Sequence, residues 1–559
     1  MSDKKPGKPL SVVIVGAGVG GVATAARLAS AGLKVTVVEK NDFTGGRCSL
    51  LYDGGHRFDQ GPSLLLLPQL FHNTFADLGT SIKEQQIELV KCEPNYVVHF
   101  NDGTHMRLST DLAVMKHEIE KHEGKEGFER YLGFLQEAHR HYELSVTHVL
   151  NRNFTSIFSM LRPSFLRHVL TLHPFESIYW RASKYFVSDR LRRVFTFASM
   201  YMGVSPLKAP GTYSLLQYTE FAEGIWYPIG GFHRIVEALV NIGKSRGVDY
   251  RLGSSVKEVL NSSDGSARAN GVILESGEVI SADMVVINAD LVYAYNNLLP
   301  KSSYAASLQT RKTSCSSISF YWSMDRVIDK LGAHNIFLAK DYEGSFDQIF
   351  EDHAMPNEPS FYVNVPSRID PTAAPPGKDS IVVLVPVGHI QDASDTGIPP
   401  QDWDALVSKA RSLVLQRMKQ DLSLPDIDQW ITHEIVNNPM TWKDRFNLDR
   451  GAILGIAHDF FNVLSFRPRT KHDSIRNLYF VGASTHPGTG VPICLAGAKI
   501  TSEQILSELG ICPPWTSVPP SRKHVTDLDM RRHRPIFSTS ILLLVASILL
   551  ALLSMFYGQ

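Results

Sequence analysis

The fold is decided by residues 11–40, which read SVVIVGAGVGGVATAARLASAGLKVTVVEK. The β-branched apolar run 12–15 predicts a buried parallel strand, 22–31 predicts a helix, and 35–38 predicts a second strand. A G-x-G-x-x-G pattern with one added glycine stands between the first strand and the helix, at Gly16, Gly18, Gly20 and Gly21. This order predicts an α/β, Rossmann-like nucleotide-binding domain.

The flanking residues extend this pattern into a dinucleotide site. Glycines at these positions allow a tight turn, close approach of the backbone to a pyrophosphate, and close packing of helix on strand. The helix N-terminus then presents free N–H groups to the phosphates. Glu39 ends the second strand, where its carboxylate can accept hydrogen bonds from a ribose. A plain glycine-rich turn would explain the glycines but not Glu39.

Two further motifs favour FAD over NAD. Gly45, Gly46 and Arg47 form a second cradle with a guanidinium suited to phosphate, which an extended FAD needs and a nicotinamide enzyme does not. Near the C-terminus, residues 477–506 read NLYFVGASTHPGTGVPICLAGAKITSEQIL. A strand at 478–481 and a helix from Val491 predict a second helix N-terminus at the flavin end. NAD as sole redox cofactor stays an alternative, although no second G-x-G-x-x-G unit is present.

Together these motifs resemble the carotenoid (phytoene) desaturases of the bacterial and fungal type, within the amine-oxidase-like flavoprotein superfamily. The resemblance covers about residues 10–510 and includes FDQGPS at 58–63, the central segment 193–239 and FRPRT at 466–470. Ser484 departs from the family, which often has glycine in that turn. The resemblance implies further cofactor-binding residues, namely Lys40, Gly61, Pro62, Ser63, Val256 against the adenine, Gly482, Ala483, Gly490, Val491 and Pro492.

Composition excludes some classes of function but does not identify one. The chain has 559 residues, 56 basic and 56 acidic, so no general attraction to nucleic acid is expected. Its five cysteines are scattered without C-x-x-C or metal spacing, which predicts a reducing compartment, no disulfide framework and no metal.

The positions of the nucleotide motifs at both ends predict discontinuous domains. Residues 1–90, 241–294 and 461–512 are assigned to the FAD-binding domain. Residues 91–240 and 295–460 form a discontinuous α+β substrate domain that faces the membrane. Residues 513–535 are Pro-rich and charged, which predicts a linker.

Two segments point to a membrane. Aromatic and arginine residues interleave in 151–186, which suits an interfacial helix where a lipid-dissolved substrate enters; packing in the core is an equally open interpretation. Residues 536–557 carry no charge, and Arg531, Arg532 and Arg534 precede them. This predicts a single-pass C-terminal transmembrane helix with the catalytic body facing the cytosol, as in an endoplasmic-reticulum-type membrane. A docked apolar helix is the alternative.

The resemblance implies a function that accounts for both the nucleotide motifs and the predicted membrane segment. Phytoene, a long polyene hydrocarbon in the bilayer, would lose a hydride from an allylic carbon to the flavin and become a more conjugated carotene, lycopene or beyond. Quinone or oxygen would accept the electrons. No catalytic base stands out, and His486 is interpreted as a turn residue bonded to backbone. The alternatives are another lipid substrate such as a retinoid, an amine, and flavin-free isoprenoid binding as in Rab escort factors.

Overall fold

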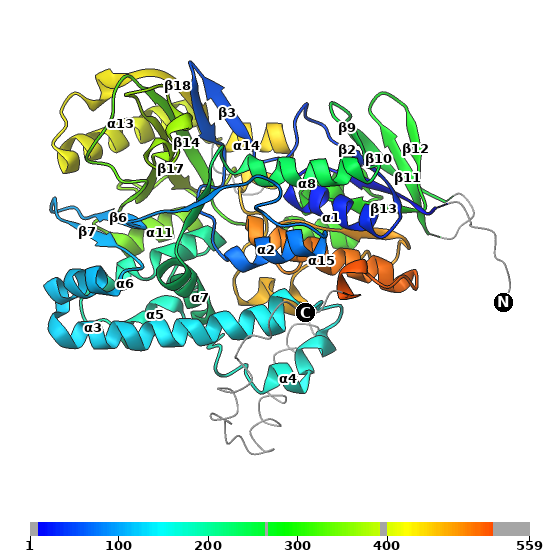
Figure 1. The fold of residues 1–559 in the computed structure, drawn as a ribbon, viewed down its shortest axis with the longest axis horizontal. Coiled ribbons are helices and arrows are strands. Elements are labelled where there is room, and N and C mark those ends of the chain that lie inside the picture. Colours follow the sequence, from blue (N-terminus) through cyan, green and yellow to red (C-terminus); the bar gives the residue numbers. More distant parts are fainter. Residues whose placement is uncertain (1–8, 263–266, 392–399, 518–559) are drawn as a thin grey trace.

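The computed structural model describes residues 9–262, 267–391 and 400–517, and a parallel five-stranded sheet lies in the half of the molecule drawn on the right of Figure 1. In sheet order, its strands are β19 (Leu478–Phe480), β13 (Met284–Ile287), β1 (Ser11–Val15), β2 (Lys34–Val38) and β9 (Asp249–Arg251). Val12 of β1 pairs with Val35 on one side and Met284 on the other. The strands therefore come from three distant parts of the chain and close one buried layer.

The alternation of side chains along β1 explains the layers on either face of this sheet. Val12 and Ile14 pack toward α1, whereas Val13 and Val15 belong to a separate core shared with an antiparallel three-stranded sheet. The helices of the first face are α1 (Val19–Ser30), α2 (Pro68–Asp77), α8 (His233–Ser245) and α15 (Val491–Glu508). The smaller sheet comprises β10 (Val256–Asn261), β11 (Ala269–Leu274) and β12 (Val279–Ser281).

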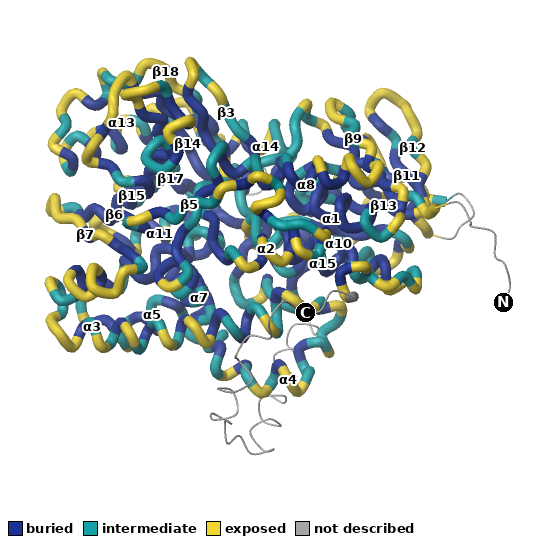
Figure 2. The backbone as a smooth tube through the Cα atoms, in the orientation of Figure 1, coloured by how far each residue is buried: buried dark blue, intermediate teal, exposed yellow. Residues whose placement is uncertain are grey.

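A seven-stranded mixed sheet forms the second half of the molecule. Its order is β18 (Ile431–Asn437), β14 (Ser316–Met324), β17 (Ser380–Val387), β16 (Phe361–Asn364), β15 (His334–Phe337), β6 (Tyr96–His99) and β7 (His105–Leu108). Ile318, Phe320 and Trp322 of β14 are buried in the core that this sheet shares with α13 (Trp403–Leu422). Figure 2 shows this core as a buried layer beneath an exposed helix surface. The side chains on the opposite face of the sheet line a cavity.

A helical layer closes the side away from α13 (Figure 1). It contains α3 (Leu112–Ser145), a π-helical turn at Val146–Leu150, α4 (Pro163–Leu166), α5 (Ile178–Ser183), α6 (Asp189–Val194), α7 (Leu215–Tyr218) and a second π-helical turn at Thr219–Glu223. The helix expected within 151–186 is instead a series of short turns, because Pro163 and Pro174 interrupt it. Phe154 and Phe165 are buried, while Phe158 and Trp180 are exposed.

The remaining β-strands and α-helices are short connections between these layers. They are the hairpin β3 (Leu50–Asp53) and β4 (His56–Asp59), the pair β5 (Leu89–Lys91) and β8 (Trp226–Pro228), and the helices α9 (Leu291–Tyr293), α10 (Ser303–Gln309), α11 (Tyr342–Phe350) and α14 (Pro439–Phe446).

The predicted membrane anchor requires correction. Within residues 9–262, 267–391 and 400–517, no helix combines the length and apolar character needed to span a bilayer. The longest, α3, carries charged side chains along its whole length, including KHEIEKHEGKEGFER at 116–130. The segment 536–557 lies outside the described residues, as does most of the predicted linker 513–535. The single-pass anchor and the cytosol-facing localisation derived from it are therefore not supported.

The predicted strands and helices around the nucleotide motifs are present. β13 has the predicted bounds, β1 begins one residue earlier than expected, and α15 starts at Val491. All five strands of the parallel sheet fall within the three segments assigned to the FAD-binding domain. The domain boundaries themselves stay a prediction.

Candidate functional site

One cavity of about 630 Å³ is lined by residues from the carboxyl ends of the parallel strands and from the open face of the seven-stranded sheet. Ligands of open α/β sheets bind at this edge, because the helix N-termini and loops meet there. All the predicted cofactor residues except Gly21 line it: Gly16, Gly18, Gly20, Glu39, Lys40, Gly45, Gly46, Arg47, Gly61, Pro62, Ser63, Val256, Gly482, Ala483, Gly490, Val491 and Pro492.

The turn between β1 and α1 requires glycine for steric reasons. Gly16 has φ +99°, a conformation that L side chains rarely adopt. A Cβ at Gly18 would lie 2.8 Å from Asn288 Oδ1, and a Cβ at Gly20 would lie 2.8 Å from Asn288 Nδ2. Gly21 lies behind the turn, and a Cβ there would overlap the carbonyl oxygen of Gly16. Asn288 Oδ1 is buried without a hydrogen-bond partner, so the cradle presents an unused acceptor.

Glu39 and Lys40 lie at the same end of the cavity, but both are engaged by the protein. Glu39 is 7% exposed, and its carboxylate accepts hydrogen bonds from the backbone N–H of Ala17 at 2.7 Å and of Asn41 at 2.8 Å. Lys40 Nζ donates to the carbonyl of Asp444 and to Asn447 Oδ1. Glu39 thereby fixes the glycine turn while its outer edge stays at the cavity wall.

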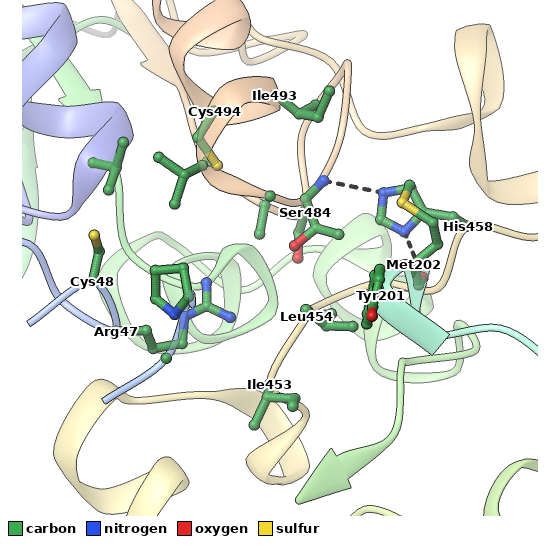
Figure 3. Close-up of a pocket in the computed structure, with 18 of the residues that line it drawn as sticks. Arg47, Cys48, Tyr201, Met202, Ile453, Leu454, His458, Ser484, Ile493 and Cys494 are labelled. Carbon is green, nitrogen blue, oxygen red and sulfur yellow. Dashed lines mark hydrogen bonds between the residues drawn. The ribbon is translucent and has the colours of Figure 1, made fainter. Parts of the chain in front are cut away.

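Arg47 is the cation of the second cradle. Figure 3 shows its guanidinium pointing into the cavity, and burial lowers its pKa. Within the described residues no salt bridge to Arg47 is formed. A Cβ at Gly61 would lie 2.6 Å from the Arg47 carbonyl oxygen. Glycine at this position therefore allows the FDQGPS segment to pack closely against the backbone of Arg47. A buried cation beside a glycine cradle and a helix N-terminus fits the pyrophosphate of a dinucleotide.

The C-terminal motif forms the opposite wall and is held by a buried arginine. Arg467 of FRPRT is 1% exposed, and its guanidinium donates to the carbonyls of Ala457, Asn462, Ile456, Ala483 and Thr485. Burial lowers its pKa to about 10. Gly482 has φ +135° and Gly490, the N-cap of α15, has φ +101°. The hydrogen bonds from the Arg467 side chain to these backbone carbonyls therefore hold the turn in its conformation.

Ser484, which departs from the family pattern, is accommodated in this turn. Ser484 is not one of the described residues with a positive φ, so the backbone at this position does not require glycine. Ser484 Oγ accepts a hydrogen bond of 3.1 Å from the Ile456 N–H and is only 4% exposed. The hydroxyl therefore connects the turn of the C-terminal motif to the segment before FRPRT.

Sequence reasoning missed His458, which joins the two halves of the cavity (Figure 3). Its Nε2 accepts from the Thr489 N–H at 3.1 Å, so Nδ1 must carry the proton that it donates to the Met202 carbonyl at 3.1 Å. Burial holds the pKa of His458 far below its usual value. A lone histidine outside any motif offers no signal of this role in the sequence.

His486 lies in the same turn, but it is absent from the residues that line the cavity. Its Nε2 donates to the Arg152 carbonyl at 2.8 Å, and burial lowers its pKa to about 4. This geometry matches the interpretation of His486 as a turn residue bonded to backbone.

Beyond the glycine motifs the cavity wall is mainly apolar and has two parts. One follows the seven-stranded sheet and its neighbours: Phe197, Ile336, Leu338, Phe346, Phe361, Val382, Leu384 and Pro386. The other lies among the short helical turns: Leu150, Met160, Phe165, Val169, Leu172, Phe175, Phe460, Leu464 and Phe466. Phe175 is 57% exposed, so the cavity reaches the protein surface there. Such walls suit a long hydrocarbon rather than a charged metabolite.

Three potential metal ligands meet away from the cavity, at Glu137, His141 and His173. Glu137 is already paired with the Arg181 guanidinium, and both ring nitrogens of His141 have hydrogen-bond partners. The trio is therefore a structural ion-pair network rather than a metal centre.

Comparison with known proteins places this architecture among flavoproteins. The family model of flavin containing amine oxidoreductases matches residues 19–506. A phytoene desaturase of Fusarium fujikuroi is 60% identical over 523 residues, covering 91% of each chain. A phytoene desaturase of Neurospora crassa is 58% identical and covers 91% of this chain and 87% of its own. The structure of putrescine oxidase bound to putrescine has a TM-score of 0.56 at 14% identity over 89% of this chain and 99% of that one, a likeness of fold alone.

Proposed function

This chain belongs to the flavin-containing amine oxidoreductase family, and from that premise we propose that it catalyses the FAD-dependent desaturation of phytoene. The reaction is an oxidoreduction of CH–CH groups that yields more conjugated carotenes. The observation that carries the proposal is the continuity of one cavity from a glycine cradle to a long apolar wall. The high identity to phytoene desaturases of two fungi supports the substrate class, and FAD is the cofactor.

The residues of the cradle would hold FAD in extended form. Gly16, Gly18 and Gly20 admit the pyrophosphate at the N-terminus of α1, and Arg47 supplies the facing cation. Glu39 and Val256 lie at the adenosine end, and Gly490 to Pro492 begin the helix at the flavin end. When bound, FAD supplies the hydride acceptor that the oxidation of a hydrocarbon needs. We propose the domain boundaries at residues 90, 240, 294 and 460 on the basis of this division.

The apolar wall then selects and orients the substrate. A hydrocarbon offers no hydrogen bonds, so its position depends on the shape of the wall formed by side chains such as Phe361, Val382 and Leu384. The same wall excludes water from the reacting carbons. A flavin-free isoprenoid-binding role is the weaker alternative, since such a protein has no use for Arg47 and the glycine cradle.

Two finer points complete the proposal. Phytoene enters from a lipid phase beside Phe175, where the cavity reaches the surface and ring centroids of Phe175 and Phe460 lie 5.0 Å apart. Quinone or oxygen accepts the electrons from the reduced cofactor. Anaerobic reduction followed by addition of either acceptor distinguishes them by the rate at which the oxidised flavin spectrum returns.

The direct test is reconstitution of the purified protein with FAD and phytoene-containing liposomes, followed by chromatography of the carotenes. The proposal predicts loss of phytoene and the formation of carotenes that absorb at longer wavelength, only when FAD is present. Binding of phytoene without conversion would contradict the enzymatic assignment and favour the binding role.

A further inference from the structure

Desaturation leaves a proton that the protein must accept. Each new double bond requires a substrate to lose a hydride to FAD and a proton from the adjacent carbon, as the electron pair of the second C–H bond becomes the π bond. This need follows from the proposed function, on which the inference rests. In a mainly apolar cavity, the acceptor must be one of the few polar side chains on the wall.

A buried chain of hydroxyls and one carboxyl begins at that wall. Tyr201 lines the cavity, and Figure 3 shows it beside Met202 and Leu454. The Tyr201 and Tyr96 hydroxyl oxygens lie 2.9 Å apart, and the Tyr96 hydroxyl lies 2.9 Å from Glu220 Oε1. Tyr96 and Glu220 are both fully buried and absent from the cavity lining. The three residues thus connect the cavity to the interior in two hydrogen bonds.

The direction of these hydrogen bonds suits acceptance of a proton. When Glu220 is ionised it can only accept, so the single hydrogen of Tyr96 is donated to Glu220 Oε1. The hydrogen between the two tyrosines must then come from Tyr201. The remaining lone pair of the Tyr201 oxygen is left for the cavity.

We propose that Tyr201 accepts the proton lost by the substrate and that Tyr96 passes a proton on to Glu220, which is the terminal base. The C–H bond on the carbon adjacent to the site of hydride loss breaks, and its proton binds the Tyr201 oxygen. Tyr201 transfers its own hydrogen to the Tyr96 oxygen, and Tyr96 transfers its hydrogen to the Glu220 carboxylate. Both tyrosines end neutral, and Glu220 ends as a carboxylic acid.

The surroundings of Glu220 provide a base of suitable strength. It lies in the π-helical turn Thr219–Glu223, a geometry often found at functional sites. Burial raises its pKa to about 8, opposed by the hydrogen bond from Tyr96. Within the described residues no salt bridge to Glu220 is formed, and its Oε2 is buried without a hydrogen-bond partner. A carboxylate of this pKa is more basic than an ordinary one, yet still ionised in part near neutral pH.

Other titratable groups face this chain from neighbouring strands. Tyr362 of β16 lines the cavity, interacts electrostatically with Tyr96 and Tyr201, and its hydroxyl lies 2.7 Å from His334 Nδ1. Burial lowers the pKa of His334 to about 3, so this histidine stays neutral over the working range. Tyr362 and His334 add no charge that changes with pH between 6 and 9. Asp59 and Asp290 also line the cavity, and burial raises the pKa of each to about 6, so their titration falls below that of Glu220.

The test compares Tyr201→Phe and Glu220→Gln with the wild type in single-turnover carotene formation between pH 6 and 9. The wild-type rate should rise with pH to a plateau above about pH 8, because the base must be ionised. Both variants should be slower at pH 9 by about 100-fold, and the rise should be absent in Glu220→Gln. A wild-type rate at pH 9 in Tyr201→Phe, or a wild-type-like pH profile in Glu220→Gln, would overturn the proposal.

Glu223→Gln is the matched control. Glu223 lies in the same π-helical turn and accepts a hydrogen bond of 2.8 Å from the Tyr142 hydroxyl, but neither residue lines the cavity. Its rate and pH profile should equal those of the wild type. A loss in Glu223→Gln equal to that in Glu220→Gln would mean that the turn acts only structurally, which would overturn the proposal.

An infrared titration separates this inference from the proposed function, because it needs neither substrate nor turnover. A protonated-carboxyl band that is lost near pH 8 should be present in the wild type and missing in Glu220→Gln. If the wild type shows this band but converts no phytoene, the proposed function fails. If the wild type converts phytoene and the variants keep its rates, the relay alone fails.

Discussion

The two ends of the cavity differ in what forms their walls. At the nucleotide end, Gly16, Gly18 and Gly20 present backbone, because any side chain would collide with Asn288 or strain the turn. At the substrate end, the wall consists of side chains from strands and short helices, such as Phe361 and Leu384. The first end is built from a few short contiguous motifs, the main one a single βαβ unit, and the second from single residues far apart in the chain.

This contrast teaches how one fold can keep a cofactor while its substrate changes. A backbone cradle has few acceptable sequences, whereas a side-chain wall can be reshaped one residue at a time. Putrescine oxidase, with a TM-score of 0.56 and 14% identity, has a similar fold, and its structure holds putrescine. Substitutions at the two ends should therefore fail in different ways, from the largest effect to the smallest as follows.

Gly21→Ala should have the largest effect. Its Cβ would overlap the Gly16 carbonyl oxygen, so α1 must move away from β1. We expect the free energy of unfolding to fall by about 3 kcal/mol and the flavin content of the purified protein to drop roughly tenfold. Denaturant unfolding and the visible spectrum measure both. In the control Gly133→Ala, within α3, the Cβ meets Tyr185 at 3.4 Å, and both properties should change little.

Arg467→Lys should rank second. An ammonium group has three donors and cannot replace a guanidinium that binds five carbonyls around the flavin-side turn. The free energy of unfolding should fall by about 2 kcal/mol, with partial loss of flavin. Arg469→Lys, in the same motif, alters an exposed ion pair with Asp473 and should cost less than about 0.5 kcal/mol. Equal losses in the two variants would refute the role given to Arg467.

Leu384→Trp should affect the substrate end alone. The larger side chain fills part of the apolar wall on β17, whereas the glycine cradle belongs to the turn between β1 and α1. We expect unchanged flavin content and carotene formation slowed about tenfold, which corresponds to about 1.4 kcal/mol. Leu384→Met, which keeps the volume, should retain most of the rate. Loss of flavin in Leu384→Trp would show that the two ends are not separable.

The pH dependence of stability gives a test of the buried carboxyl that needs no substrate. The pKa of Glu220 rises from 4.5 to about 8 on folding, so the folded state holds its proton more tightly than the unfolded state. Its contribution to stability is fully present below pH 4.5 and is lost as pH rises to about 8, at no more than about 1.4 kcal/mol per pH unit. Asp59 and Asp290, with pKa raised to about 6, act in the same direction at lower pH.

Glu220→Gln isolates this contribution. Denaturant unfolding at pH 6.5 and at pH 8 should show a smaller loss of stability in the variant than in the wild type. The same loss in both proteins would mean that Glu220 does not titrate in this range.

The nucleotide end could be predicted because each of its motifs is a contiguous stretch of sequence. Strand, glycine turn, helix and second strand follow each other within residues 11–40, and the structure reproduces them with end shifts of a few residues. The C-terminal strand and helix were equally recognisable. That these residues bind FAD stays a prediction, although all but Gly21 line one cavity.

The substrate end could not be predicted, because tertiary packing alone brings its residues together. Tyr96 meets Tyr201 across 105 positions and Glu220 across 124. No periodicity or spacing links such residues. His458 shows the same limit, since a lone histidine gains its role only when Thr489 and Met202 reach it. The segment 151–186 is not one continuous helix, since prolines divide it into short helices and turns, and its position at a membrane surface stays a prediction.

The central claim is that a flavin at the backbone end oxidises a hydrocarbon held at the side-chain end. An anaerobic titration of the FAD-loaded protein tests it most directly, with phytoene in liposomes and putrescine as separate additions and the oxidised flavin band as the readout. The account predicts that phytoene bleaches the band while putrescine leaves it unchanged. A band that persists with phytoene, or that bleaches with putrescine, would contradict it.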